Sequence, residues 1–150
     1  MKGWLLDTNV IAEMSGARPD GNVARWFDAQ PEQILFLSVL TIGEYQKGIA
    51  TLPAGDKRRP QLQRSVVALE KRFAGRVLSV SDPIVLRWGA ISGEVKRLTG
   101  HSPSVVDTML AATAMEHGLY LATRNIVHVA HSGAAVFNPW KDDPKLFPLK

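Results

Sequence analysis

The 150-residue chain contains no cysteine, which excludes disulfide scaffolds and metal sites built from thiolates. The absence agrees with a reducing cytoplasm, where we expect the protein to act. No stretch approaches 18 uninterrupted apolar residues, and the apolar run before Asp7 is too short for a secretory signal. The sequence therefore predicts no association with a membrane.

Several common enzyme signatures are also missing. No G-x-G-x-x-G and no G-x-x-x-x-G-K-[ST] occurs, so dinucleotide binding and P-loop nucleotide hydrolysis are unsupported. No G-x-S-x-G marks a serine hydrolase, and no H-E-x-x-H marks a zinc protease. Asp7-Thr8-Asn9 lacks the second aspartate of phosphatases that use an aspartyl nucleophile. These absences remove the most easily recognised hydrolase and nucleotide-binding classes.

Charge is only mildly unbalanced. Lys and Arg number 18 against 14 Asp and Glu, a net charge of +4, in an otherwise ordinary globular composition. The basic residues gather in one region: Lys57, Arg58, Arg59, Arg64, Lys71, Arg72 and Arg76. Such a run is either a solvated helix face or a surface that follows nucleic-acid phosphates, and the sequence leaves both interpretations open.

Short apolar runs alternate with helical periodicity along the chain. Strands are predicted at 4–6, 34–39, 77–80, 119–122 and 135–137. Helices are predicted at 10–14, 22–29, 41–50, 62–73, 82–100 and 104–117. This alternation is typical of an α/β fold with a mostly parallel sheet of about five short strands and helices on both faces. Residues 1–140 would form this one domain, followed by an irregular tail at 141–150.

Local signals place several element ends. Thr41 and Glu44 have the spacing of a capping box, and Asp82 precedes a proline as an N-cap should. Ser104 and Gly118 are expected to start and stop one helix. A loop is predicted across Pro53, Gly55 and Pro60. Packing, rather than base stacking, is the favoured role of Trp26, Trp88 and Trp140.

Three acids stand near predicted strand ends, where open parallel sheets bind ligands. Asp7 ends the first strand, Glu44 lies in the first turn after the second, and Asp107 lies in the first turn of the helix before the fourth. Taken singly, each is explained by capping or by the helix dipole. Taken together, three like charges would repel in a partly dry cleft unless a cation lay between them. Mg²⁺ or Mn²⁺ accepts such oxygen ligands.

Five segments occur in an order that resembles a known family. They are LLDTNVIAE, SVLTIGEYQKGI, VVDTMLAATAMEHGL, LATRN and VFNPW. Together they resemble the PIN-domain toxins of bacterial toxin–antitoxin pairs, of the VapC and FitB type. The resemblance runs from Trp4 to Trp140 and implies a three-layer α/β/α PIN-like fold.

The resemblance also implies an activity. The family's acids match Asp7, Glu44 and Asp107, and its small hydroxyl residue matches the supporting Thr8. The chain would then be a Mg²⁺- or Mn²⁺-dependent endoribonuclease that cleaves RNA phosphodiesters with metal-activated water. Asp7 and Asp107 would ligate the metal directly, and Glu44 would ligate through water or orient the nucleophile.

Partners follow from the same resemblance. We expect a homodimer silenced by a small antitoxin of the VapB or FitA kind, with operator DNA contacted only through the antitoxin. Apolar positions in the helices predicted at 22–29 and 62–73 are expected to include the antitoxin or dimer contact.

The chain departs from the family at one position. A fourth aspartate is common in the T-R-D position, where this sequence has Asn125. Asparagine keeps an acceptor oxygen but loses the charge, so we count it with the catalytic residues as a weaker contributor. His128 is read as an exposed loop histidine in preference to a member of the site. The alternative function is a weakly active or inactive PIN-fold module that binds RNA or an antitoxin without cutting.

Overall fold

Five parallel strands form a single sheet in the computed structural model, which describes residues 1–150. The strands are β1 (Trp4–Leu6), β2 (Leu35–Ser38), β3 (Val77–Leu78), β4 (Tyr120–Ala122) and β5 (Val136–Phe137). Their order is β3-β2-β1-β4-β5. The strands β2 and β3 extend the sheet to one side of β1, and β4 and β5 extend it to the other side. Because all strands are parallel, their carboxyl ends lie at one edge. The expected five-stranded parallel sheet is confirmed.

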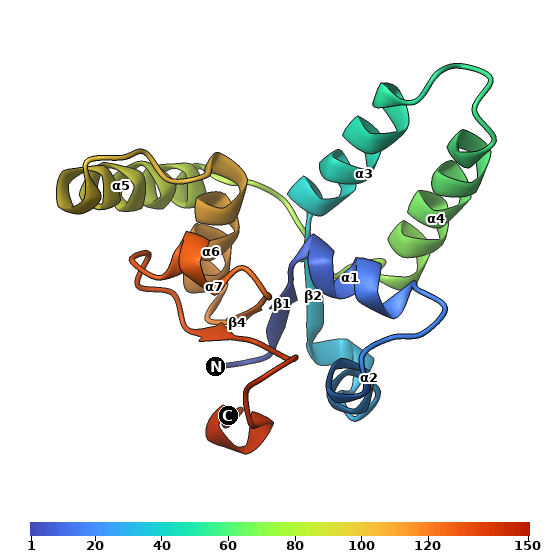
Figure 1. The fold of residues 1–150 in the computed structure, drawn as a ribbon. Helices are drawn as coiled ribbons and strands as arrows, with labels where there is room; N and C mark the ends of the chain where they lie inside the picture. The colour runs from blue at the N-terminus through green and yellow to red at the C-terminus, as the bar shows by residue number, and fades with distance from the viewer.

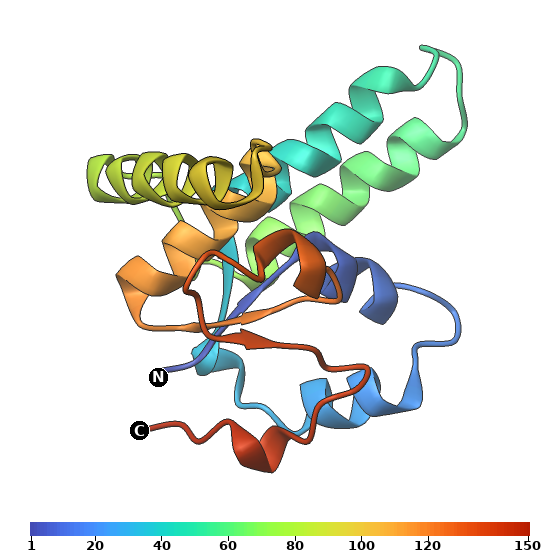
Figure 2. The same cartoon turned by 60° about the vertical axis from the view of Figure 1, so that its left-hand side comes forward.

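Helices surround the sheet (Figures 1 and 2). They are α1 (Thr8–Met14), α2 (Gly21–Asp28), α3 (Val39–Thr51), α4 (Arg58–Arg72), α5 (Asp82–Thr99), α6 (Val105–His117) and α7 (Ile126–Val129). Two short 3-10 helices, η1 (Glu32–Ile34) and η2 (Pro144–Leu146), complete the chain. The helices α3 and α4 lie side by side and project away from the sheet (Figure 1).

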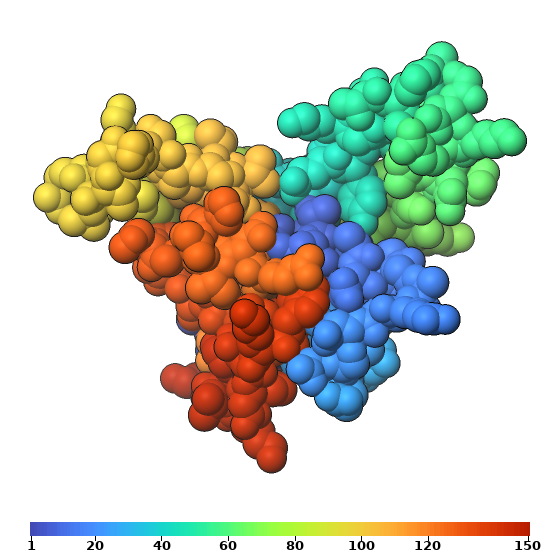
Figure 3. Space-filling view, in the orientation of Figure 1, coloured from blue at the N-terminus to red at the C-terminus, as the bar shows by residue number.

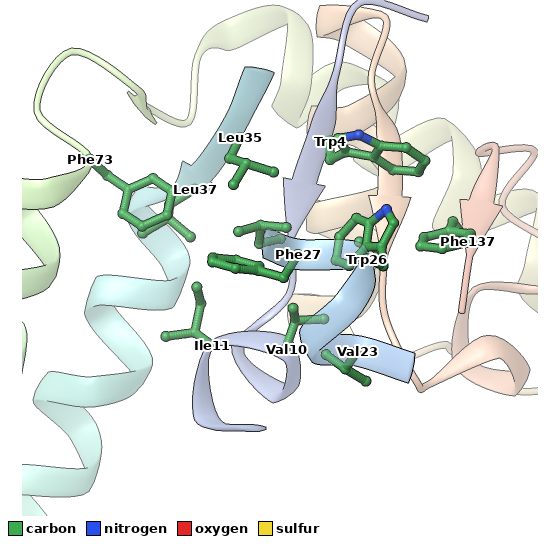
Figure 4. Close-up of a cluster of buried hydrophobic side chains, with 12 residues drawn as sticks. Trp4, Val10, Ile11, Val23, Trp26, Phe27, Leu35, Leu37, Phe73 and Phe137 are labelled. Atoms are coloured by element: carbon green, nitrogen blue, oxygen red, sulfur yellow. The ribbon is translucent and has the colours of Figure 1, made fainter. Parts of the chain in front are cut away.

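The core has two sides because successive strand residues point to opposite faces of the sheet. Trp4 and Leu6 belong to a cluster that packs β1 against α1 and α2 (Figure 4). Trp4 and Trp26 meet edge to face with ring centroids 5.2 Å apart. Leu5 and Leu121 join a separate cluster on the other face with Leu110 of α6. The sheet is therefore the middle of three layers, as the resemblance implied.

The hairpin of α3 and α4 has a small core of its own, formed by Ile42, Ile49 and Val66. The opposite side of α4 is exposed and basic. Arg72 pairs with Glu32 at 2.8 Å, and both side chains are about half exposed. Exposed pairs of this kind stabilise a protein by at most about 1 kcal/mol. The pairing agrees with a solvated face, and the phosphate-binding alternative stays a prediction.

The predicted capping box is wrong. Helix α3 begins at Val39, and the hydroxyl of Ser38 accepts a hydrogen bond from the Leu40 N–H at 3.1 Å. Because Ser38 already caps the helix, Thr41 lies inside it as a buried residue, and Glu44 is free to bind elsewhere. The prediction took the second candidate cap along the chain for the first.

Two element ends predicted from prolines differ in the structure. Pro60 lies in the first turn of α4, which begins at Arg58, and not in the loop. A proline in the first turn removes no helical hydrogen bond, so Pro60 is compatible with the helix. The loop therefore ends before Arg58. Asp82 is the first residue of α5 rather than its N-cap, which is Ser81.

Other ends were predicted correctly. Ser104 caps α6, and Gly118 ends it in the left-handed region at a φ of 64°. The aromatic residues Trp26, Trp88 and Trp140 all pack against apolar clusters, as expected. By contrast, the apolar residues of α2 are buried in the chain's own core, so α2 does not offer them to an antitoxin or a second copy.

The two ends of the chain meet. The backbone N–H of Lys150 donates to the carbonyl of Met1 at 3.0 Å, and the termini lie close together in Figure 1. Phe147 packs edge to face on Phe137 with centroids 4.8 Å apart.

None of the helices has both the length and the apolar character needed to cross a bilayer.

Candidate active site at the carboxyl ends of β1 and β4

Asp7 lies at the centre of the site. It follows the last residue of β1 directly, and its backbone N–H donates to the carbonyl of Ala122 at 3.0 Å. This bond extends the pairing of β1 and β4 to the point where both strands end. Asp7 is also the N-cap of α1, as the sequence suggested, and its side chain is buried, with 5% exposed.

Both carboxylate oxygens of Asp7 accept hydrogen bonds. The Thr8 N–H donates to Oδ1 at 2.7 Å, and the Thr123 hydroxyl donates to Oδ2 at 2.6 Å. The side-chain amide of Asn9 donates to Oδ2 as well, at 3.2 Å. Thr123 follows β4 directly, so the two central strands of the sheet fix the orientation of this carboxylate between them.

The pKa of Asp7 depends on burial, on its hydrogen bonds and on the other two acids. Burial raises the pKa of Asp7 above its usual value, because the charged form loses its hydration. The hydrogen bonds from Thr123 and Thr8 oppose this effect. The negative charges of Asp107 and Glu44 raise the pKa of Asp7 further. The structure thus brings the acids close enough to repel.

Glu44 is held by Thr8. The Thr8 hydroxyl donates to Oε1 of Glu44 at 2.7 Å, which joins the first turn of α1 to α3. Thr41 lies one turn earlier in α3, with its hydroxyl oxygen 3.4 Å from that of Thr8. A cavity of about 280 Å³ opens beside Thr8 and Glu44. In Figure 3 a notch between the α3–α4 hairpin and the α5–α6 side has the start of α1 at its base.

Asp107 approaches the site from α6. Its backbone N–H donates to the hydroxyl of the N-cap Ser104 at 3.4 Å, and its side chain is 16% exposed. A carboxylate in the first turn is favoured by the partial positive charge of the helix N-terminus. Oδ2 of Asp107 lies 3.7 Å from Nδ1 of His128. His128 is exposed, as predicted, but it lies on the short helix α7 and touches an acid of the site.

Asn125 is near these residues but less firmly held. It precedes α7, and its backbone N–H donates to the hydroxyl oxygen of Thr123 at 3.0 Å. No hydrogen bond joins its side chain to Asp7, Glu44 or Asp107. The side chain is exposed and lines a cavity with Arg124 and His128.

The donor chemistry fits a hard divalent cation. Three carboxylates supply oxygen ligands, and a cation among them would relieve the repulsion that raises the pKa of Asp7. No three Asp, Glu or His side chains already converge closely enough to hold a metal ion. Oε1 of Glu44 accepts a hydrogen bond from Thr8, and direct ligation by all three acids would require their carboxylates to move closer together. Mg²⁺ usually keeps several waters and needs only one or two carboxylates, so Asp7 and Asp107 with water would suffice.

Two contributors to the site were not predicted. Thr123 and Asn9 bind the Asp7 carboxylate and each other, the Asn9 amide donating to the Thr123 hydroxyl oxygen at 3.1 Å. The signal was present in the sequence, because each follows the end of a predicted buried strand by one to three residues. Neutral hydroxyl and amide groups at strand ends are common for structural reasons, so this signal does not single them out as acids at the same positions do.

The sequence matches the PIN domain over residues 4–130. The chain belongs to the PIN domain family. The matched range contains all four predicted catalytic positions, Asp7, Glu44, Asp107 and Asn125. The resemblance drawn from the ordered motifs is confirmed.

Individual PIN proteins are similar along nearly the whole chain. Toxin FitB of Neisseria gonorrhoeae is 35% identical over 138 residues, which cover 92% of this chain and 99% of that protein. VapC ribonuclease Y4jK of Sinorhizobium fredii is 35% identical over 137 residues, covering 91% and 97%. Among solved structures, FitAB bound to an IR36 DNA fragment is 33% identical, with a TM-score of 0.82, covering 93% of this chain and 97% of that chain.

Proposed function

We propose that this PIN chain is the toxin of a toxin–antitoxin pair and a Mg²⁺- or Mn²⁺-dependent endoribonuclease. The observation that carries the proposal is the placement of buried Asp7 at the ends of the central strands, held by Thr123 and the Thr8 N–H, with Glu44 bound to the hydroxyl of the same Thr8. The negative charges of Asp107 and Glu44 act on this carboxylate and raise its pKa. The names of its relatives, Toxin FitB and VapC ribonuclease, support the same function.

Each side chain of the site has a distinct proposed role. Asp7 and Asp107 would ligate the cation directly, while Glu44 would bind through water or orient the attacking water. When bound, Mg²⁺ or Mn²⁺ supplies an acidified water and stabilises charge on the scissile phosphate. Hydrogen bonds from Thr123 and the Thr8 N–H favour the charged form of Asp7 and so oppose the rise in its pKa that burial causes. The hydroxyl of Thr8 positions Glu44.

The proposed partners are an RNA substrate, a small antitoxin and a second copy of the chain. Solved relatives support the antitoxin, since one is the FitAB complex on a DNA fragment and another is FitAcB from Neisseria gonorrhoeae at 34% identity. DNA would be reached through the antitoxin. The setting would be the cytoplasm, where RNA is accessible.

Cleavage of RNA with added and chelated Mg²⁺ or Mn²⁺ tests this function. Wild type should cut, and a chelator should stop it. The Asp107→Asn variant should lose at least about a hundredfold, because even residues that only orient metal ligands contribute 10–100-fold. Asp28→Asn is the control, since Asp28 is exposed at the end of α2. Equal cleavage by Asp107→Asn and wild type would reject the proposal.

One observation favours a second candidate. The exposed, uncharged Asn125 stands where the family commonly has an acid, and its side chain is bound to none of the three acids. The chain would then be a weak or inactive PIN module that binds RNA or antitoxin without cutting. Under this alternative, wild type shows no metal-dependent cleavage in the same assay.

A further inference from the structure

A cavity of about 370 Å³ lies where α5, the turn into α6, and α7 meet. Its floor is apolar and includes Ile91 and Val95, which are buried in the chain. Its rim is polar and holds three of the chain's four histidines, together with serine and threonine hydroxyls. These histidines are His101, His128 and His131. We call this cavity the histidine pocket.

The histidine pocket adjoins the acidic site. His128 lies on its wall, and Nδ1 of that ring is 3.7 Å from Oδ2 of Asp107. Ser104, which caps the helix that carries Asp107, lines it too. The helices α6 and α7 lie beside each other in both ribbon views (Figures 1 and 2). A chain-like substrate held at the acids therefore has the pocket within reach of its next unit.

The lining chemistry selects a flat, neutral, polar ring. None of the residues that line the pocket is an acid, a lysine or an arginine, so no permanent charge is there to attract a phosphate. The histidines do not form a group that could hold a metal ion. Imidazole rings stack on unpaired nucleobases and offer N–H and N groups to their edges. An apolar floor below a few polar groups is the usual build of a small-ligand pocket, and the volume falls in the usual range.

A second cavity on the other side of α7 carries the charges that the histidine pocket lacks. It measures about 520 Å³ and is lined by Arg124 and Lys141 as well as by Asn125. Its one acid, Asp142, accepts a hydrogen bond from the Asn138 N–H at 2.8 Å. The two cavities share Val127 and His128, so α7 separates a cationic surface from a neutral one.

We propose that the histidine pocket binds the base of a nucleotide next to the scissile phosphate in single-stranded RNA. The backbone of that RNA crosses α7 toward Arg124 and Lys141. The pocket would then help to select the sequence that is cut, because only an unstacked base can enter it. This inference rests on the proposed ribonuclease function and adds where an unpaired base beside the cut would bind.

The test uses a double variant, His101→Ala with His131→Ala, which spares His128 because that ring touches Asp107. The control is His117→Ala, at the far end of α6 and outside the pocket. Binding of short single-stranded RNAs of varied sequence is measured in the presence of chelator. Cleavage positions on a long RNA are mapped with Mg²⁺ or Mn²⁺. The melting temperature of each variant is measured to show that the variants fold as wild type does.

The double variant should bind RNA about tenfold more weakly than wild type, as expected for the loss of base stacking. Its cleavage sites should become less selective for the base beside the cut, while His117→Ala behaves as wild type. Unchanged affinity together with an unchanged cleavage pattern would overturn the pocket and leave the ribonuclease function standing. If wild type binds RNA without cutting it, and the double variant binds tenfold more weakly, the pocket stands as a base-binding site and the ribonuclease function fails. If wild type neither binds nor cuts RNA, both fail.

Discussion

The hydroxyl of Thr123 donates its only proton to Oδ2 of Asp7 at 2.6 Å. The direction of this bond is fixed, because the Thr123 oxygen already accepts from the Asn9 amide and from the Asn125 N–H. The residue after β4 thereby holds the residue after β1. A threonine that no sequence motif for metal ligands would select is thus the main side-chain partner of the buried acid.

Thr123→Val should damage both stability and the pH profile. The substitution keeps the shape but leaves one oxygen of a buried carboxylate with less support, a change that costs about 1–3 kcal/mol of unfolding free energy. The pKa of Asp7, already raised by burial, would rise further, so cleavage should begin at higher pH. Urea unfolding and a pH–rate profile measure the two effects.

Thr113→Val is the matched control for that change. Thr113 is equally buried, and its hydroxyl donates within α6 to the carbonyl of Met109 at 2.8 Å. It should lower stability without moving the pH at which cleavage begins. A shift of similar size in both variants would show that Thr123 acts only on the fold.

Thr8 should act through Glu44. Thr8→Val removes the hydroxyl that donates to Oε1 of Glu44 at 2.7 Å, whereas Thr8→Ser keeps it. We expect Val to reduce kcat by about 10–100-fold, as is usual for residues that orient metal ligands, and Ser to restore most of the activity. Steady-state RNA cleavage at saturating metal measures this. If Val and Ser behave alike, the hydrogen bond to Glu44 has no part in the reaction.

Asn125→Asp should strengthen metal binding. The substitution places a fourth negative charge beside Thr123, and cation affinity rises with the number of charged ligands. The Mg²⁺ concentration that gives half-maximal cleavage should fall about tenfold. Gln63→Glu adds the same charge on the exposed side of α4 and should change nothing. Cleavage that appears only in Asn125→Asp would identify the natural protein as the inactive module.

Asp7→Asn should become more stable relative to wild type as the pH rises. Because burial raises the pKa of Asp7, the folded chain holds this proton more tightly than the unfolded chain does. Wild type therefore loses stability as the pH increases from the unfolded pKa, about 3.9, through the raised folded pKa. The variant has no such loss, so its melting temperature should gain on that of wild type across this window.

Added Mg²⁺ separates this effect from simple packing. At neutral pH it should raise the melting temperature of wild type, since a ligand that binds only the folded chain stabilises it. It should do so much less for Asp7→Asn. Asp28→Asn, an exposed control, should follow wild type at every pH. A difference in melting temperature between Asp7→Asn and wild type that stays constant with pH would contradict the role of the buried charge.

Strand positions and the layered fold could be predicted because they depend on local patterns. Trp4-Leu5-Leu6 is apolar on both faces of the sheet, and the structure buries all three residues. Gly118 could be predicted because a helix end in the left-handed region favours glycine. The start of α3 could not, since Ser38 and Thr41 are both good caps and only tertiary packing decides between them.

The acids of the site were predicted from strand ends and ordered motifs, but their partners were not. The bond from Thr8 to Glu44 joins residues 36 positions apart, and that from Thr123 to Asp7 joins residues 116 apart. A strand end indicates that Thr123 and Asn9 lie near the site, but the sequence does not say which side chains these residues bind. The approach of His128 to Asp107 also depends on the docking of α7 against α6.

The central claim is that Asp7 and Asp107 serve a single metal-dependent cleavage site. The most direct test compares RNA cleavage by Asp7→Asn, Asp107→Asn and the double variant, at equal metal concentration. Residues that act as one unit are not additive, so the double variant should lose little more than either single variant, each down at least about a hundredfold. Losses that multiply, or wild-type cleavage by either single variant, would contradict the claim.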